Sequence, residues 1–272
     1  METKDDFSLL RKIPNVLRAR GYRIYTQEGR RLIDLWLTGG AAILGHTPAN
    51  ILREIKNAAS RGLYSPFPHF TEGRYLKALL KLFPGRAFRL YAAPPPELPV
   101  LFNKGEAKFW RPFTNPADPF AITEDTPLLV PVLPGFQIWR GGFPFGLCVL
   151  AAKEARYFES KTQFPESDSL PPVLLTAAAR GIYDILAAPE RAKIKFPRIE
   201  IALEKNCWRR EGIYLYLKKE PKTEEWIALF QKFLEVGFLL PPSPSFPVIL
   251  PGELSAGEDA KLAAVLGESC AC

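Results

Sequence analysis

The sequence predicts a mixed α/β fold, and three features indicate it. Short runs rich in β-branched and aromatic residues occur toward both ends of the chain, segments with apolar residues at helical spacing separate them, and prolines crowd the middle. Of the 272 residues, 47% are hydrophobic and 24% are charged, which is average for a folded domain. The chain is therefore expected to be globular and long enough to bury a sizeable core.

The first predicted elements are a short helix, a β-hairpin and a longer helix. Residues 22–25 and 31–36 are β-rich runs, and the Thr-Gln-Glu-Gly-Arg between them contains the glycine typical of a turn. Thr47 and Pro48 have the residue types of an N-cap and a first helical position. We therefore expect a helix that begins there and ends by Gly62.

A second helix and a proline-rich connector follow. Apolar residues at helical spacing predict a helix from about Thr71 to Phe83. The chain has 27 prolines, and many of them fall between residues 94 and 134. Because proline has no amide hydrogen, this stretch is expected to be an irregular connector with short extended pieces at 99–102 and 128–132.

The C-terminal part alternates helices and strands. Its first helix carries almost no charge and is expected to be buried, and Ser255 with Glu258 forms a capping box before the last helix. The expected elements are, in order, a helix over 171–186, strands over 198–203 and 213–217, a helix capped by Thr223, a strand over 248–250 and a helix over 260–266.

Charge and hydropathy argue against two classes of partner. The formal net charge is +7, but basic and acidic residues are mixed along the chain instead of gathering into a phosphate-binding stripe, so no nucleic-acid partner is expected. No apolar stretch approaches the roughly 20 residues that span a bilayer, so no membrane partner is expected. The first residues lack the apolar segment of a secretory signal, and we expect a cytoplasmic protein.

The four cysteines and two histidines offer no metal-site spacing. Cys148 lies in an apolar run and is interpreted as a buried small hydrophobe. The terminal Cys270-Ala-Cys272 is able to chelate a soft metal or accept a lipid, or it is a frayed tail with reducible thiols. With Cys207 the only other cysteine, no second pair completes a zinc-finger pattern, and no metal site is predicted.

Three motifs, in this order along the chain, carry a resemblance to a known family. The predicted hairpin over 20–35 ends on Asp-Leu, residues 39–46 read Gly-Gly-Ala-Ala-Ile-Leu-Gly-His, and residues 141–146 read Gly-Gly-Phe-Pro-Phe-Gly. Together they resemble the class III aminotransferases, which are pyridoxal-phosphate (PLP) enzymes of fold type I. The resemblance covers roughly residues 16–93 and 128–266, and it implies a reduced α/β architecture that retains the small domain of the family.

The resemblance also identifies a missing reactive group. In the family a lysine stands four residues before the Gly-Gly and forms a Schiff base with the cofactor; here that place is held by Gln137. The amide nitrogen of glutamine is not nucleophilic and cannot form an imine. The alternatives Lys104, Lys108 and Lys153 lie in the connector or after a strand, without the buried setting that a Schiff-base lysine needs.

Two further departures fall in the middle of the chain, where the family is longer. A turn whose backbone amides hold the cofactor phosphate is expected after the second helix, but Pro94-Pro-Pro has no amide hydrogens to offer. The aspartate that pairs with the pyridine nitrogen is expected on a buried strand, and residues 128–134 contain no carboxylate. The resemblance therefore implies a shortened form that has lost much of the parallel sheet between Phe83 and Gln137.

From these residues we expect an aminotransferase-like protein that is catalytically inactive, binds no cofactor, and has a binding or scaffold role. The alternatives are a residual or atypical PLP-dependent transaminase, or a relic without function. We expect residues 1–90 to form the N-terminal hairpin and helices, 91–164 the remnant of the cofactor domain, and 165–272 the C-terminal α/β domain. The three parts are expected to form one continuous structural unit.

The resemblance places the ligand-cleft candidates at Gly39, Gly40, His46, Arg140 and Arg209, and no catalytic residue is assigned. The two glycines either give amides to an anion or form a tight turn, and Arg209 either holds a carboxylate or is an exposed residue at the end of a loop. Because the family dimerises through the segment 38–46, self-association or binding to an intact paralogue is expected. The apolar residues of this segment and of 64–70 would then form the contact surface.

Overall fold

The computed structural model describes residues 6–62, 67–92, 95, 98, 104–122, 127–130, 137–139, 143–145, 148–155, 157–158, 164–204 and 206–269. It divides into two compact units. The first unit comprises residues 1–47, 113–119 and 189–272, and the second comprises 48–112 and 120–188. These boundaries differ from the three predicted segments, and the expectation of one continuous structural unit stays a prediction.

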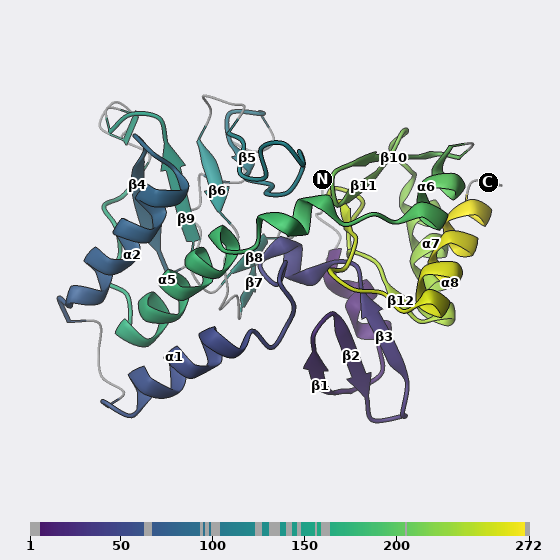
Figure 1. Cartoon of the computed structure of the whole chain (residues 1–272), viewed down its shortest axis with the longest axis horizontal. Coiled ribbons are helices and arrows are strands. Elements are labelled where there is room, and N and C mark those ends of the chain that lie inside the picture. The colour runs from purple at the N-terminus through teal and green to yellow at the C-terminus, as the bar shows by residue number, and fades with distance from the viewer. Residues whose placement is uncertain are drawn as a thin grey trace. The chain divides into compact units, whose positions relative to one another are not determined.

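The first unit contains a four-stranded sheet of order β1-β2-β3-β12, built from both ends of the chain (Figure 1). Neighbouring strands are antiparallel except β3 and β12, which are parallel. The predicted hairpin is confirmed as β2 and β3, and β1 is an additional strand. The elements are the 3-10 helix η1 (Asp6–Lys12) and the strands β1 (Val16–Arg20), β2 (Arg23–Thr26), β3 (Arg31–Asp34) and β12 (Phe238–Leu239).

The end of β3 is held between two C-terminal strands by the backbone of one residue. The Leu35 amide donates to the Leu239 carbonyl at 2.9 Å, and the Leu35 carbonyl accepts from the Ile249 amide at 2.7 Å. Leu35 itself is fully buried. Residue 35 thus joins the N-terminal hairpin to the two strands that follow the penultimate helix.

The rest of the first unit is a three-stranded sheet of order β10-β11-β13 with three helices. The predicted strands over 213–217 and 248–250 are confirmed, as are the last two helices. The elements are the 3-10 helices η2 (Leu37–Gly40) and η3 (Pro189–Lys193), the helices α6 (Pro197–Leu203), α7 (Thr223–Val236) and α8 (Ala256–Glu268), and the strands β10 (Trp208–Glu211), β11 (Tyr214–Leu217) and β13 (Val248–Ile249).

The predicted strand over 198–203 is wrong, because these residues form α6. Ile199, Ile201 and Leu203 are large apolar residues at every second position, separated by Glu200 and Ala202, a pattern that suggests a strand. In the helix, Ile199 and Leu203 are four residues apart on the buried face, and Ile201 is 68% exposed. Pro197 is the first residue of α6, and because proline is favoured at that position it indicates a helix in spite of the alternation.

Two of the three predicted helix caps differ from the structure. The Ser255 cap of α8 is confirmed, with its hydroxyl accepting from the Glu258 amide at 3.3 Å. Thr223 is the first residue of α7, whose cap position is Lys222. Thr47 caps no helix; its hydroxyl accepts from the Gly21 amide at 3.3 Å instead. Both threonines precede or begin a helix, but the cap position falls on the neighbouring residue, Pro48 before α1 and Lys222 before α7.

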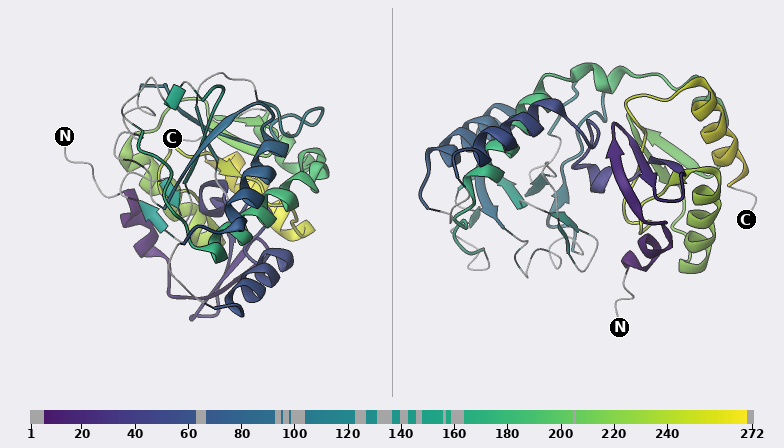
Figure 2. Two further views of the ribbon diagram at one scale, coloured as in Figure 1. Left: turned by 90° about the vertical axis from the view of Figure 1, so that its left-hand side faces the viewer. Right: turned by 90° about the horizontal axis from the view of Figure 1, so that it is seen from below.

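The second unit has a four-stranded sheet of order β4-β9-β6-β5 with helices on one face (Figure 2). Only β5 and β6 are parallel neighbours in it. A separate pair, β7 with β8, is antiparallel. The elements are the helices α1 (Ala49–Ala59), α2 (Phe70–Leu82) and α5 (Pro172–Leu186) and the strands β4 (Ala87–Tyr91), β5 (Lys108–Phe109), β6 (Leu128–Val130), β7 (Gln137–Trp139), β8 (Phe143–Phe145) and β9 (Cys148–Ala152).

The predictions for the second unit hold over its described parts. The three helices begin and end within three residues of the predicted positions, and α5 packs against both α1 and α2. Residues 128–130 form a strand, whereas residues 99–102 lie outside the described ranges. Cys148 is a free, fully buried cysteine in β9, as its apolar neighbours indicated. Across the described residues, no helix combines the length and apolarity needed to cross a bilayer.

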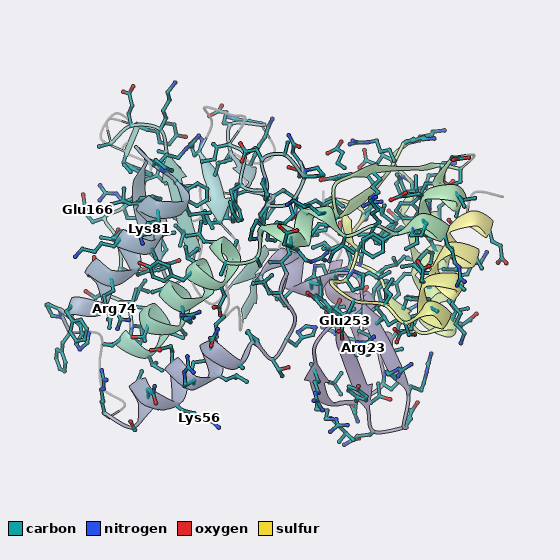
Figure 3. The ribbon with its side chains drawn as sticks, in the orientation of Figure 1. Arg23, Lys56, Arg74, Lys81, Glu166 and Glu253 are labelled. Atoms are coloured by element: carbon teal, nitrogen blue, oxygen red, sulfur yellow. The ribbon has the colours of Figure 1, made fainter. Side chains whose placement is uncertain are left out.

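The hairpin is also tied to α8 by an ion pair. Arg23 of β2 donates through Nε and Nη2 to the two carboxylate oxygens of Glu258, at 3.0 and 2.7 Å, and through Nη1 to Glu253 at 2.8 Å. The side chain of Glu258 is 8% exposed and that of Glu253 is 68% exposed; Figure 3 shows Arg23 and Glu253 side by side. The Arg23 guanidinium lowers the pKa of Glu258 to about 2 from 4.5.

Replacing Glu258 should therefore destabilise the protein in a pH-dependent way. Glu258→Gln keeps an acceptor for the helix cap but removes the charge, and we expect a loss of about 2 kcal/mol in the free energy of unfolding at neutral pH. Because the folded-state pKa is lowered, this stabilisation is present above pH 4.5 and is lost as pH falls toward about 2. Urea unfolding of wild type and variant between these pH values measures it.

Glu253→Gln is the matched control, since Glu253 contacts the same arginine at an exposed position. Its expected loss is below about 0.5 kcal/mol. Equal losses for the two variants, or a Glu258→Gln difference that does not shrink at low pH, would contradict this account.

Candidate functional site

The candidate site lies in the first unit, where the chain leaves β3. Four consecutive residues there, 37–40, have positive φ angles, including the non-glycine residues Leu37 (φ 49°) and Thr38 (φ 53°). A left-handed β-branched residue such as Thr38 is strained by about 1–2 kcal/mol. Such a strained run persists only where surrounding contacts hold the backbone in this conformation. Backbone strain of this kind is concentrated at functional sites in proteins.

The buried carboxylate of Asp34 supplies those contacts. One of its oxygens, Oδ1, accepts from the Trp36 amide at 2.8 Å and from the Leu37 amide at 2.9 Å. The other, Oδ2, lies 2.9 Å from Nε2 of His46. Asp34 is 2% exposed. A single side chain thus sets the turn that follows β3 and fixes the imidazole on the far side of the glycine-rich loop.

His46 is held by its backbone as well as its ring. Its amide donates to the Gly21 carbonyl at 2.7 Å, which brings the loop against the start of the hairpin. Gly45 makes this approach feasible: its φ is 97°, and a Cβ there would lie 3.0 Å from the Gly21 carbonyl oxygen. Because a carboxylate only accepts, neutral His46 carries its hydrogen on Nε2 and leaves Nδ1 as an acceptor.

Tyr22 and Arg191 complete the cluster. The Tyr22 hydroxyl donates to the Ile43 carbonyl at 3.5 Å, and the Arg191 guanidinium carbon lies 5.7 Å from the centre of the Tyr22 ring. Arg191 is 5% exposed, and its Nη2 donates to the Leu250 carbonyl. Burial raises the pKa of Tyr22 and lowers the pKa of Arg191. Gly252 is also required here, since a Cβ would lie 2.1 Å from the Tyr22 hydroxyl oxygen.

The chemistry available in this cluster is binding and orientation. Among the described residues no ion pair joins Arg191 to a carboxylate, and its Nε and Nη1 have no hydrogen-bond acceptor. A buried guanidinium of this kind is suited to hold an anionic or hydrogen-bonding group. The described cluster contains no serine, cysteine or lysine that would act as a nucleophile.

The structure brings three of the predicted site residues together. Gly39, Gly40 and His46 all belong to the loop after β3. The Gly39 amide donates to the Trp36 carbonyl at 3.0 Å, so the tight-turn interpretation holds for this residue. Asp34, Tyr22 and Arg191 were not among the site residues predicted from the sequence. The Asp-Leu that ends the hairpin was a visible signal for the first of these, whereas nothing in the sequence marked Arg191.

The other predicted residues are not in this cluster. Arg209 is in β10, where it forms an ion pair with Glu211 and stacks over the Tyr216 ring at 4.5 Å. Its side chain is 49% exposed, which matches the alternative of an exposed surface residue. Arg140 lies outside the described residues. Gln137 begins β7, opposite Phe145 of β8, and only its backbone is described.

In the family that the sequence resembles, PLP is held by a Schiff-base lysine and by a carboxylate at the pyridine nitrogen. A Schiff-base lysine needs a desolvated setting, yet no lysine in the described ranges is buried. All are exposed except Lys232, which is half-buried, and Lys56 points away from α1 in Figure 3. Lys4, Lys161 and Lys205 are outside those ranges. Strand β6 is buried and consists of Leu128, Leu129 and Val130, so it offers no carboxylate to a pyridine nitrogen.

Comparison with known proteins identifies the fold. No family model matches the chain. It is 29% identical over 280 residues to an uncharacterized protein of Treponema pallidum (strain Nichols), covering 89% of this chain and 91% of that protein. Over 67 residues it is 39% identical to the glutamate-1-semialdehyde 2,1-aminomutase of Lawsonia intracellularis, which covers 25% of this chain and 16% of that protein.

Two solved structures that resemble the chain are aminotransferases. Ornithine δ-aminotransferase of Plasmodium falciparum has a TM-score of 0.66 and 11% identity, over 94% of this chain and 92% of the other. Acetylornithine aminotransferase of Elizabethkingia anophelis has a TM-score of 0.62 and 12% identity, over 98% and 99%. The chain therefore has the mixed α/β fold of the PLP-dependent aminotransferases of class III type.

Substitutions at Asp34 should separate its two roles. Asp34→Ala leaves the Trp36 and Leu37 amides without an acceptor, and we expect a loss of about 3–5 kcal/mol in the free energy of unfolding. Asp34→Asn keeps an oxygen for both amides and removes only the charge that faces His46, and its expected loss is about 1–2 kcal/mol. Denaturant unfolding measures both, and equal losses would show that the turn does not depend on these amide bonds.

Proposed function

We propose that this chain is a non-catalytic binding or scaffold protein built on the aminotransferase fold. The observation that carries the proposal is Gln137, which stands where the resemblance to class III aminotransferases places the Schiff-base lysine. A glutamine amide cannot form the imine on which transamination depends. The exposure of the described lysines and the apolar character of β6 support the same conclusion. On this proposal the protein binds no PLP.

The cluster of Asp34, His46 and Arg191 suits a binding role. Asp34 orients the imidazole of His46, Arg191 is a buried cation packed against Tyr22, and none of the described residues of the cluster is a serine, cysteine or lysine nucleophile. We also propose that the middle of the chain is a shortened form of the cofactor domain. Its proline-rich connector has few backbone amides with which to bind the phosphate of PLP. The competing functions are a residual or atypical PLP-dependent transaminase and a relic, and the first experiment below distinguishes the transaminase from the other two.

Wild-type protein incubated with PLP and reduced with borohydride should carry no stoichiometric adduct on any single lysine, by peptide mass mapping. Gln137→Lys should also remain unlabelled, since restoring the amine does not restore the phosphate cradle or the pyridine partner. Lys153→Arg controls for adducts at the candidate nearest in sequence. Labelling of one lysine in the wild type would support the transaminase, and labelling of Gln137→Lys would show that the pocket is intact.

For the partner we propose self-association or an intact paralogue, through the second unit. The apolar residues expected to form the contact surface differ in burial: Ala41, Ala42 and Ile43 are buried, whereas Phe67 and Phe70 are 62% and 60% exposed. Residues 41–43 are therefore buried within the chain and do not form an exposed contact surface. The two phenylalanines remain candidates for the contact, since large exposed apolar residues commonly mark an interaction surface.

The wild type at micromolar concentration should scatter light with a mass above the 30.5 kDa of one chain. Phe67→Ser with Phe70→Ser should lower that mass toward the monomer, because the substitutions remove apolar area from the contact. Ile201→Ser is the matched control, as Ile201 is 68% exposed in the other unit. A monomeric wild type would exclude self-association and leave the paralogue, and equal effects of the control would reject the phenylalanines as the surface.

A further inference from the structure

The positive charge of the chain is concentrated in its N-terminal hairpin. Residues 11–31, which include β1 and β2, contain seven lysines and arginines and one acidic residue, Glu28. They therefore hold six of the seven net positive charges of the whole chain, and outside this segment basic and acidic residues nearly balance. A local excess of one charge sign attracts partners of the opposite sign and speeds their association.

Two of these basic residues lie exposed on one face of β1. Arg18 and Arg20 are two positions apart on the strand, so their side chains are on the same side of the sheet. Two carboxylates from the C-terminal part of the chain contact the hairpin, but they pair with Arg23 and Arg31. Over the described residues neither Arg18 nor Arg20 forms an ion pair, and both are able to pair with a carboxylate from outside the chain.

Strand β1 is also an edge strand with an open side. In the order β1-β2-β3-β12 it has a neighbour on one side only, and Figure 1 shows it at the border of the sheet beside β2. An edge strand leaves alternate amide and carbonyl groups without a partner strand, and an extended chain is able to pair with them. Val16 and Leu17 at the start of β1 are 52% and 64% exposed, so the edge has apolar surface beside its two arginines.

We propose that the open edge of β1 binds an extended acidic segment of another protein, which joins the sheet as an additional strand. Backbone hydrogen bonds to the edge would supply affinity, and carboxylates at alternate positions would face Arg18 and Arg20. Val16 and Leu17 would contact apolar side chains of the segment. This proposal goes beyond the function proposed above, because it depends neither on the absence of PLP nor on the exposed phenylalanines of the second unit.

The edge suits a peptide better than a second copy of this chain or a nucleic acid. Pairing two β1 edges would bring Arg18 and Arg20 of both copies together, and like charges on neighbouring strands repel. A nucleic acid would be attracted by the charge, but it would leave the backbone groups of the edge and its apolar residues unused. The aromatic ring opposite Arg18, that of Tyr25, is stacked against the Arg18 guanidinium at 4.6 Å and is not open to a base on that side.

The test titrates the full chain into a fluorescein-labelled peptide of sequence Glu-Val-Glu-Val-Glu-Val-Glu and follows fluorescence anisotropy at physiological ionic strength. We expect saturable binding. The peptide with lysine in place of glutamate should bind at least about tenfold more weakly, because its charges oppose those of the edge.

Two further peptides, N-methylated either on the valines or on the glutamates, test the backbone pairing. Only one of these two sets of alternate amides faces the edge of the sheet. One of the two peptides should therefore bind at least about tenfold more weakly than the unmethylated one, because it has lost the donors of the added strand.

Arg18→Glu with Arg20→Glu should weaken binding of the acidic peptide at least about tenfold, since two attractions become repulsions. Lys219→Glu with Lys261→Glu is the matched control, because it makes the same change of charge at exposed positions of the same unit outside the hairpin. The control should bind within about twofold of the wild type, because its charges do not face the added strand. Urea unfolding checks that both double variants are folded.

The proposal is overturned if the acidic peptide does not bind, which would show that the arginines protect the edge from pairing. It is also overturned if both double variants weaken binding equally, or if neither N-methylated peptide loses affinity, since charge alone would then account for the binding. Binding of single-stranded poly-uridine in place of the peptide, lost in Arg18→Glu with Arg20→Glu, would assign the surface to nucleic acid and overturn it as well. None of these outcomes bears on the PLP or light-scattering experiments, which concern other residues.

Discussion

The pairing of β3 with the C-terminal strands is the constraint on which the first unit depends. Leu35 bonds to Leu239 of β12 through its amide and to Ile249 of β13 through its carbonyl, so this residue joins the N-terminal hairpin to strands of two sheets near the other end of the chain. Asp34 comes directly before this clamp, and its carboxylate sets the left-handed turn and positions His46. The candidate site therefore exists only when the two ends of the chain are joined, and packing of the surrounding core maintains it.

The local elements were largely predictable, because each rests on contacts within a few residues. Ser255 and Glu258 indicated the start of α8, and the apolar spacing gave α2 and α5. Strand β1 escaped prediction because most of its side chains are exposed and show no alternation. Residues 198–203 were misread because three alternating apolar residues fit both a strand and, once Pro197 starts the turn, a helix.

The site was only partly predictable, for a different physical reason. Gly39, Gly40 and His46 are close in sequence and form a recognisable motif, so they were found together. Arg191 contacts Tyr22 and Leu250, which are distant from it in sequence, and no local sequence pattern predicts such a contact. The fold does not require a lysine at position 137, since the pairing of β7 with β8 uses the backbone of that residue and not its side chain. An aminotransferase fold is therefore compatible with the loss of its chemistry.

The interleaved first unit has a consequence for synthesis of the chain. Strand β3 emerges early, but its parallel partner β12 is made about 200 residues later, or roughly 10–40 s at usual elongation rates. Until then the β3 edge has unsatisfied backbone groups and an apolar face. All residues of the second unit, in contrast, are present once Ala188 has been made. The order of translation thus favours folding of the inserted unit first, while the β3 edge stays unpaired until β12 has been made.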